Sequence, residues 1–161
     1  MSNYDSGSYV LKHEARQTVK VLADVLGKVL PCYSNGWIKG DCPQGSGPIL
    51  ETLLVEGHTD HHPFRDPQGK LSPEGNDRLS TERALAVFEE LWQSRTGLDG
   101  LRNADQLALL GFSGYGDRRP LPSEADYKKN RRIDLRFVLT PKTSTEFQEL
   151  KKRIDKELEA Q

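Results

Sequence analysis

The segment Ile49-Leu-Glu-Thr-Leu-Leu-Val-Glu56 is short, mostly apolar and followed by Gly57. Such a run predicts a strand buried at the centre of a sheet. His58, Thr59 and Asp60 come next, which places a carboxylate at the carboxyl end of this strand. Ligands of α/β sheets usually bind at such strand ends. We therefore expect the chain to fold around this strand and to hold its site just beyond it.

Helical and strand patterns alternate on either side of this segment. A helix is expected from Val10 to Leu30, ended by Pro31, and a second helix from an N-cap at Ser80 to near Gly97. Further strands are predicted at 106–112 and 133–139, with a short helix at 123–130. The sequence thus predicts an α/β (α+β) two-layer sandwich, with helices on one side of a small mixed sheet and the first two strands parallel. The predicted core positions are Leu11, Ala15, Val19, Leu22, Leu26, Val29, Ala84, Val87, Phe88, Leu91, Ile133, Leu135, Phe137 and Leu139.

The length of 161 residues suits one domain, which we place at 1–140. A highly charged helix is expected at 141–161, with an apolar stripe of Phe147, Leu150, Ile154 and Leu158. We expect this stripe to pack on its own domain. A homodimer contact is the alternative.

Charge and hydropathy exclude several classes of partner. Lys and Arg number 23 against 24 Asp and Glu, so no overall field attracts nucleic acid or an acidic membrane surface. No apolar segment reaches the roughly 20 residues that a bilayer span needs, and no signal peptide is evident. The chain is expected to be either cytosolic or the soluble part of a longer exported or membrane-tethered protein.

Cys32 and Cys42 lie in a loop rich in Gly, Pro, Asn and Ser. Their spacing favours a local disulfide, which implies an oxidising compartment. Two free loop thiols are the alternative. A zinc site is not expected, because the pair is isolated and no His lies near it in the sequence.

Arg83 is an unusual residue for its position if Ser80 caps the second helix. It would then lie in the first turn, where the helix dipole disfavours a cation. Free backbone N–H groups and a guanidinium at that point would form a receptor for a carboxylate. With Asp60 nearby, the two charges would match a ligand that carries both an ammonium and a carboxylate group. A structural salt bridge between Asp60 and Arg83, or pairing of Arg83 with a nearby Glu, is the alternative.

Four motifs occur in order: Gly57-His-Thr-Asp60, Asn76-x-x-Leu79-Ser80-x-x-Arg83-Ala84, Gly114-Tyr-Gly116 with Pro120, and Asn130-Arg-Arg132. From about Tyr4 to Leu139 the chain resembles the OmpA-like C-terminal peptidoglycan-binding domains, the family of OmpA, Pal and MotB. The resemblance implies that Asp60 and Arg83 hold the zwitterionic end of diaminopimelate in cell-wall stem peptides. It also implies supporting roles for Thr59, Asn76, Leu79 and Arg131.

Between Asp60 and Asn76 the sequence departs from the family, with His61-His62-Pro63-Phe64 and extra residues after the Asp. His-Thr-Asp-x-x-Pro and Gly-Tyr-Gly-Asp-Arg-Arg-Pro are similar to versions in stator subunits of ion-driven motors, such as MotB and ZorB. The resemblance implies a periplasmic, non-enzymatic wall anchor without a cofactor, tethered to a membrane of a Gram-negative bacterium by a segment outside this sequence. No nucleic-acid partner is expected.

Three other interpretations compete with wall binding. His58, Asp60, His61 and His62 could hold a metal ion, although adjacent His residues do not easily converge. Ser80 with His58 and Asp60 could form a hydrolase triad, but no Gly-x-Ser-x-Gly elbow surrounds Ser80. A protein-protein interaction module that has kept the fold and lost wall binding is the third.

Overall fold

The computed structural model describes residues 4, 7–35, 42, 47–65, 68–72, 74–94, 97–122 and 127–140. The predicted C-terminal helix at 141–161, with Phe147, Leu150, Ile154 and Leu158, lies outside these residues, as does the first part of the short helix predicted at 123–130. Within the described ranges, no helix is long and apolar enough to cross a bilayer.

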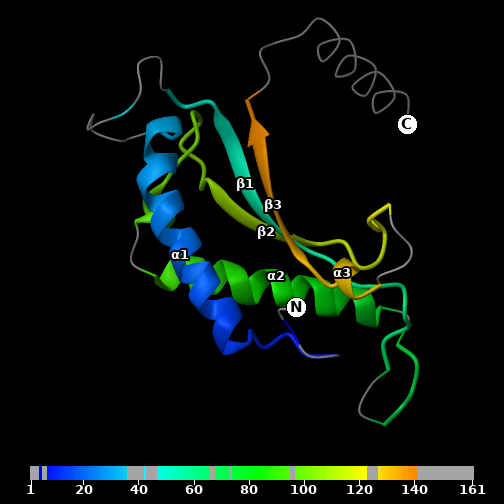
Figure 1. The fold of residues 1–161 in the computed structure, drawn as a ribbon. Helices are drawn as coiled ribbons and strands as arrows, with labels where there is room; N and C mark the ends of the chain where they lie inside the picture. Colours follow the sequence, from blue (N-terminus) through cyan, green and yellow to red (C-terminus); the bar gives the residue numbers. More distant parts are fainter. Residues whose placement is uncertain are drawn as a thin grey trace, which may run out of the picture.

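Within the described residues, the sheet has three strands in the order β2-β1-β3 (Figure 1). The central strand β1 (Leu50–Gly57) pairs in parallel with β2 (Leu110–Gly114) and antiparallel with β3 (Ile133–Leu139). The expected small mixed sheet is confirmed, with parallel first and second strands.

The second strand begins later than predicted, at Leu110 instead of Gln106. Gln106 has a positive φ of 65°, which a strand does not accept. The side-chain oxygen of Asn103 accepts hydrogen bonds from the backbone N–H groups of Asp105 and Leu107. This local turn chemistry competes with the ladder and overrides the apolar pattern of 106–109.

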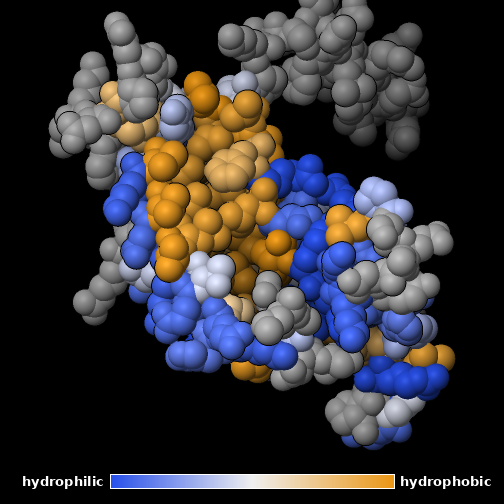
Figure 2. Space-filling view, viewed as in Figure 1, coloured by the Kyte–Doolittle hydropathy of each residue, from blue (hydrophilic) through white to orange (hydrophobic). Residues whose placement is uncertain are grey.

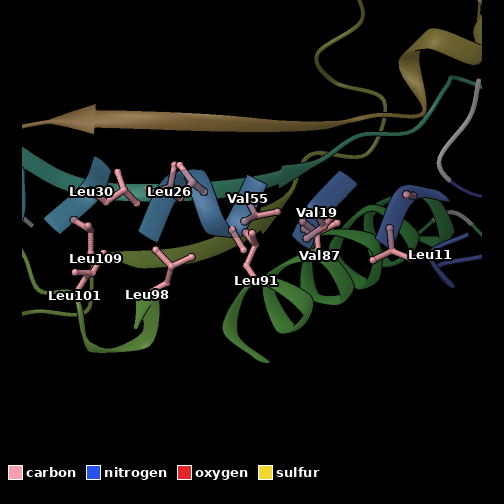
Figure 3. Close-up of a cluster of buried hydrophobic side chains, with 14 of the residues drawn as sticks. Leu11, Val19, Leu26, Leu30, Val55, Val87, Leu91, Leu98, Leu101 and Leu109 are labelled. Carbon is pink, nitrogen blue, oxygen red and sulfur yellow. The ribbon is translucent and has the colours of Figure 1, made fainter. Parts of the chain in front are cut away.

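In the part of the chain that the structure describes, two long helices form the other layer. α1 (His13–Val29) continues into a 3₁₀ turn at Leu30–Tyr33, and α2 (Gly75–Gln93) packs against α1, β1 and β2. A second 3₁₀ turn spans Leu98–Gly100, and the short α3 (Tyr127–Asn130) precedes β3. Figure 3 shows the buried side chains that these elements share, including Leu26 and Leu30, Val55, Val87 and Leu91.

The predicted core of α1 is confirmed at Ala15, Val19 and Leu26, while Leu22 is only partly buried. The prediction is wrong at Val29, which is exposed. Ala23 and Leu30 are buried in addition. The buried face of α1 is therefore centred on Ala15, Val19, Ala23, Leu26 and Leu30, and Val29 lies beside it.

The second helix begins at Gly75, five residues before the predicted N-cap Ser80. Its first turn is anchored by tertiary contacts instead of a cap. Gly75 lies so close to Phe64 that an added Cβ would overlap the ring, and the Asn76 side chain donates to the carbonyls of Asp60 and His62. The Gly-Asn-Asp composition at this point indicates a loop to sequence reasoning, and these contacts override that preference.

The loop between Asp60 and α2 is closed at its base. Phe64 accepts a hydrogen bond from Ser72 N, and Arg65 forms an isolated antiparallel bridge with Leu71. The Arg65 side chain also donates to the carbonyl of Gly69, which has a φ of 79°. Phe64 and Ser72, and Arg65 and Leu71, therefore lie side by side at the base of this loop.

Cys32 and Cys42 are joined by a disulfide with a Cα–Cα distance of 5.4 Å. The predicted pairing is thus present in the structure. It ties the 3₁₀ turn that follows α1 to the loop before β1.

Candidate ligand-binding site

Asp60 lies just beyond the carboxyl end of β1, held by the backbone around it. Thr59 N donates to the carbonyl of Gly116 at 2.8 Å, which ties this segment to the turn after β2. One carboxylate oxygen of Asp60 accepts a hydrogen bond from His62 N at 3.1 Å, and the other lies 3.7 Å from Nε of Arg131. The Asp60 side chain is 13% exposed, so solvent reaches the carboxylate.

Arg83 lies eight residues after Gly75, in the third turn of α2. The prediction that it sits in the first turn is wrong, and neither the helix dipole nor free N–H groups at the helix start act on it. Instead it is a buried cation, 1% exposed. Its Nε donates to the carbonyl of Ser8 at 2.9 Å, and its guanidinium lies 4.9 Å from the centroid of the Tyr4 ring.

The charges around Arg83 bring the predicted pair together. Burial lowers the pKa of Arg83 and is the largest influence on it. Arg131 lowers this pKa further, while the carboxylate of Asp60 and the Tyr4 side chain raise it. Asp60, Arg83 and Arg131 are thus within electrostatic reach of one another, as one anion with two cations.

The remaining predicted site residues surround this trio in different ways. Asn76 uses its amide to hold the backbone of Asp60 and His62. Thr59 is buried, and its hydroxyl has no hydrogen-bond partner among the described residues. Leu79 is buried one turn before Arg83 in α2.

Two glycines allow the strand ends to approach α2 closely. A Cβ on Gly57 would overlap the carbonyl of Ser80, and one on Gly114 would overlap Thr81. Ser80 is not a cap here. Its hydroxyl donates to the carbonyl of Asp77 at 2.8 Å and accepts from Gly116 N at 2.9 Å. The close approach of Gly57 to Ser80 brings the end of β1, and therefore Asp60, next to the turn of α2 that carries Arg83.

A second charged cluster lies on the sheet face opposite the helices. Glu56 is fully buried, and its carboxylate accepts from Arg136 at 2.6 and 2.8 Å and from Arg119 at 3.3 Å. Burial raises the pKa of Glu56, but the hydrogen bonds and charge of Arg136, with smaller contributions from Tyr115 and Arg119, together outweigh it, so the net shift is downward. The Arg119 guanidinium lies 3.6 Å from the Tyr115 ring centroid. Arg136 therefore ties the middle of β3 to the end of β1.

His58 belongs to this second cluster and not to the Asp60 site. Its Nε2 lies 3.2 Å from a carboxylate oxygen of Asp134, and its ring stacks on Tyr115. Burial lowers the pKa of His58, with Arg132 adding to the shift and Asp134 opposing it. His58 therefore does not form the imagined triad with Ser80 and Asp60. Across the described part of the chain, no three His, Cys, Asp or Glu side chains are grouped to hold a metal.

An apolar hollow of about 410 Å³ lies elsewhere, on the flank of α2 and β2. It is lined by Phe88, Trp92 and Phe112 with Leu85, Glu89 and Gln93. Glu89 is the one charged group in this lining. A site for a ligand with a carboxylate needs a cation, which the lining of this hollow lacks and the Asp60–Arg83 region supplies.

Sequence reasoning missed Tyr4 and Ser8 as parts of the site. The Tyr4 hydroxyl donates to the carbonyl of Arg83 at 3.1 Å, and its ring supports the guanidinium. Both residues precede α1, and neither follows a helical or strand period. The resemblance, which begins at about Tyr4, was the one signal that reached this segment.

Comparison with known proteins gives matches at the level of structure. No protein-family model and no curated protein sequence matches the chain. The C-terminal domain of Helicobacter pylori MotB is 19% identical, with 97% of this chain and 94% of that chain covered and a TM-score of 0.53. A longer periplasmic fragment of the same MotB is 18% identical, covering 97% of this chain and 86% of that one, with a TM-score of 0.56.

A lipoprotein has the same fold. The peptidoglycan-associated lipoprotein of Burkholderia pseudomallei is 23% identical, covers 85% of this chain and 88% of its own, and has a TM-score of 0.52. At these identities the likeness concerns the fold alone. Together with the mixed sheet and its two helices, these matches show that the chain has the fold of the OmpA, Pal and MotB type of domain.

Proposed function

We propose that this domain binds peptidoglycan non-covalently through the diaminopimelate of stem peptides and so anchors a membrane-tethered protein to the wall from the periplasm. The observation that carries the proposal is the Asp60 carboxylate just beyond β1, paired with Arg131 at 3.7 Å and within electrostatic reach of the buried Arg83 guanidinium of α2. Structural neighbours that include a peptidoglycan-associated lipoprotein and MotB periplasmic domains support the same assignment.

The charge pattern suits an amino-acid head group. Asp60 can accept hydrogen bonds from a ligand ammonium group, and Arg83 can donate to a carboxylate. Arg131, close to Asp60, adds a second cation, so the site carries one more positive than negative charge. That excess favours ligands with additional carboxylates, which stem peptides carry at their ends.

Partial burial makes these charges effective. Charge-assisted hydrogen bonds gain strength where water is excluded, and Arg83 is almost entirely screened from it. The buried hydroxyl of Thr59 supplies a further polar atom next to Asp60, and Leu79 supplies an apolar neighbour to Arg83. Hydrogen bonding of the Thr59 hydroxyl to a ligand would remove the desolvation cost of an unsatisfied buried group.

The MotB likeness supports a stator of an ion-driven motor as the parent protein. In that role the domain holds the stator to the wall, and no chemical step is required of it. The Ser80 hydroxyl, which a hydrolase would need as a nucleophile, is held by the backbone of Asp77 and Gly116. Binding, rather than catalysis, is therefore the proposed activity.

The test is co-sedimentation of the purified chain with sacculi. Asp60→Asn removes the anion, and Arg83→Lys keeps a charge in the buried position but removes the planar fork. Each should weaken binding by about 2–3 kcal/mol, roughly a hundredfold, through loss of a charge-assisted hydrogen bond. Binding should also fall when sacculi with lysine in place of diaminopimelate are used.

Matched controls separate binding from folding. Asp99→Asn and Arg78→Lys change the same residue types at sites outside the trio, the latter on the same helix, and should bind as the wild type does. Thermal unfolding of every variant shows whether the fold persists. Equal sedimentation of the wild type and both site variants, with the fold intact, would refute the assigned site. Equal binding to lysine-type wall would refute recognition of diaminopimelate.

A further inference from the structure

An apolar surface remains exposed between α1 and β3. Figure 2 shows it as a continuous orange area in the upper half of the view, and in the same view Figure 1 draws α1 on the left of this area and β3 on its right. We call it the α1–β3 face, and its large side chains are each between 47% and 64% exposed. They are Val21, Val25 and Val29 of α1 with Phe137 and Leu139 of β3.

The three valines form a stripe on the flank of α1 that points away from α2. They are spaced four residues apart, which aligns them along one side of the helix. On the opposite flank, Arg16 and Lys20 reach Glu90 of α2 at 3.8 and 4.0 Å. A helix with charged groups toward one neighbour and valines on its outer flank is built to meet a second apolar neighbour.

The strand side of the α1–β3 face is the core side of the sheet. Phe137 pairs with Leu53, which is fully buried in the core, and Leu135 pairs with the equally buried Val55. Side chains of paired residues share a sheet face, so Phe137 points into the helix layer and not to the opposite side. Yet α2 lies on β1 and β2, and Phe137 and Leu139 of β3 remain exposed.

Contiguous exposed apolar surface of this kind marks an interaction site, while singly scattered apolar residues do not. The core side of β3 is packed at Ile133 and Leu135 but exposed at Phe137 and Leu139, which departs from the two-layer rule that each apolar face is covered. The face therefore needs an occupant that is itself apolar along one side.

We infer that the occupant is the C-terminal segment of the same chain, residues 141–161, folded as an amphipathic helix. Its stripe of Phe147, Leu150, Ile154 and Leu158 would pack on the α1–β3 face and complete the helix layer over β3. This inference is independent of the proposed wall binding, because the Asp60–Arg83 site lies at the other end of β3, beside Ile133.

Length and connection fit this occupant. The stripe from Phe147 to Leu158 spans about 16 Å as a helix, and the seven residues of β3 span about 23 Å. The chain leaves β3 at Leu139, within the face itself. The seven residues 140–146 reach up to about 23 Å when extended, enough to turn back along the strand.

Covalent connection favours this segment over a second copy. A tethered segment experiences an effective concentration in the millimolar range, which a separate protein molecule does not reach at ordinary concentrations. The intramolecular contact should therefore form first.

Cysteine pairing in the full chain tests the contact. Val25→Cys with Leu150→Cys should form a cross-link within one chain under mild oxidation, identified by intact mass and peptide mapping beside the Cys32–Cys42 bond. Val25→Cys with Lys152→Cys is the matched control. Lys152 lies about 200° around the helix from Leu150, so this pair should stay reduced. Equal cross-linking of both pairs would overturn the inference.

Hydrogen exchange gives a second measurement without cysteines. Val25→Asp should speed amide exchange in residues 146–158 by about tenfold or more. A buried charge destabilises the state in which this segment packs on the α1–β3 face, but not the state in which it is released. Val10→Asp, at an exposed valine outside the face, should leave it unchanged. Fast exchange of 146–158 in the wild type would overturn the inference. So would a dimer by light scattering whose Val25–Leu150 cross-link joins two chains, which would identify a second copy as the occupant.

Discussion

Gly57 is the position where one added methyl group should do most damage to both fold and site. A Cβ there would overlap the backbone carbonyl oxygen of Ser80 in α2, and a helix carbonyl cannot swing aside as a side chain can. The helix must shift away from β1, which opens the packing between the core residues of both elements. Overpacking of this kind costs about 3 kcal/mol at the upper end of its usual range.

The chain offers a graded series for the same substitution. In Gly111→Ala the new Cβ would lie 3.0 Å from Leu54 Cδ2, the end of a flexible side chain, and in Gly100→Ala it would meet nothing within 4 Å. We expect Gly57→Ala to lower Tm by about 6–12 °C, Gly111→Ala by about 2–4 °C and Gly100→Ala by nothing measurable. Circular dichroism melts of the three variants and the wild type give these values.

Gly57→Ala should also weaken binding to sacculi at temperatures where the variant is still folded. The shift separates Asp60, three residues after Gly57, from the turn of α2 that carries Arg83. If the Tm of Gly57→Ala equals that of Gly100→Ala, the close approach of β1 to α2 is not what positions the site, and the reasoning fails. Normal binding by a destabilised Gly57→Ala would refute the link between this contact and the Asp60–Arg83 geometry.

Two further predictions concern the second charged cluster and the disulfide. The pKa of His58 is lowered from its ordinary value of 6.5 by burial and by Arg132, so the unfolded chain takes up this proton first as the pH falls. The free energy of unfolding should therefore fall between about pH 7.5 and pH 5.5 in the wild type and less so in His58→Gln, as measured by urea titration at each pH; parallel profiles would contradict this. Reduction of the Cys32–Cys42 bond should raise the intact mass by two hydrogen atoms and lower stability by about 2–3 kcal/mol, whereas an unchanged mass would show that the thiols were free.

Among the described residues, periodicity was enough to predict the two long helices and the strands, but not where α2 and β2 begin. The apolar run at β1 and the alternation at β3 carry their own signals, so the mixed sheet follows from the sequence. The start of α2 does not, because Gly75 and Asn76 are held by Phe64, Asp60 and His62, which lie ten or more residues away in the chain. Contacts at that separation leave no local pattern.

The site, like the fold, was predicted only where the local sequence carries a signal. Asp60 could be placed from the end of a buried strand, while Arg83 was singled out for a wrong physical reason, its supposed place in the first helical turn. The structure gives the pair a different basis, in which burial, Tyr4 and the close approach of Gly57 to Ser80 position the guanidinium. Tyr4 was missed because an isolated aromatic residue before a helix has no periodic context.

The closed base of the loop after Asp60 makes its tip a permissive place for engineering. Both ends of this loop are held by three contacts: the hydrogen bond from Ser72 N to Phe64, the Arg65–Leu71 bridge and the Asn76 amide. The residues beyond these contacts are therefore not needed to hold the backbone of Asp60 in place. Residues around Gly69 can then be lengthened, shortened or replaced by an epitope or a fluorophore attachment site while the charged trio keeps its geometry. The same contacts at the base of the loop explain how such a domain can tolerate inserted residues close to Asp60, Arg83 and Arg131.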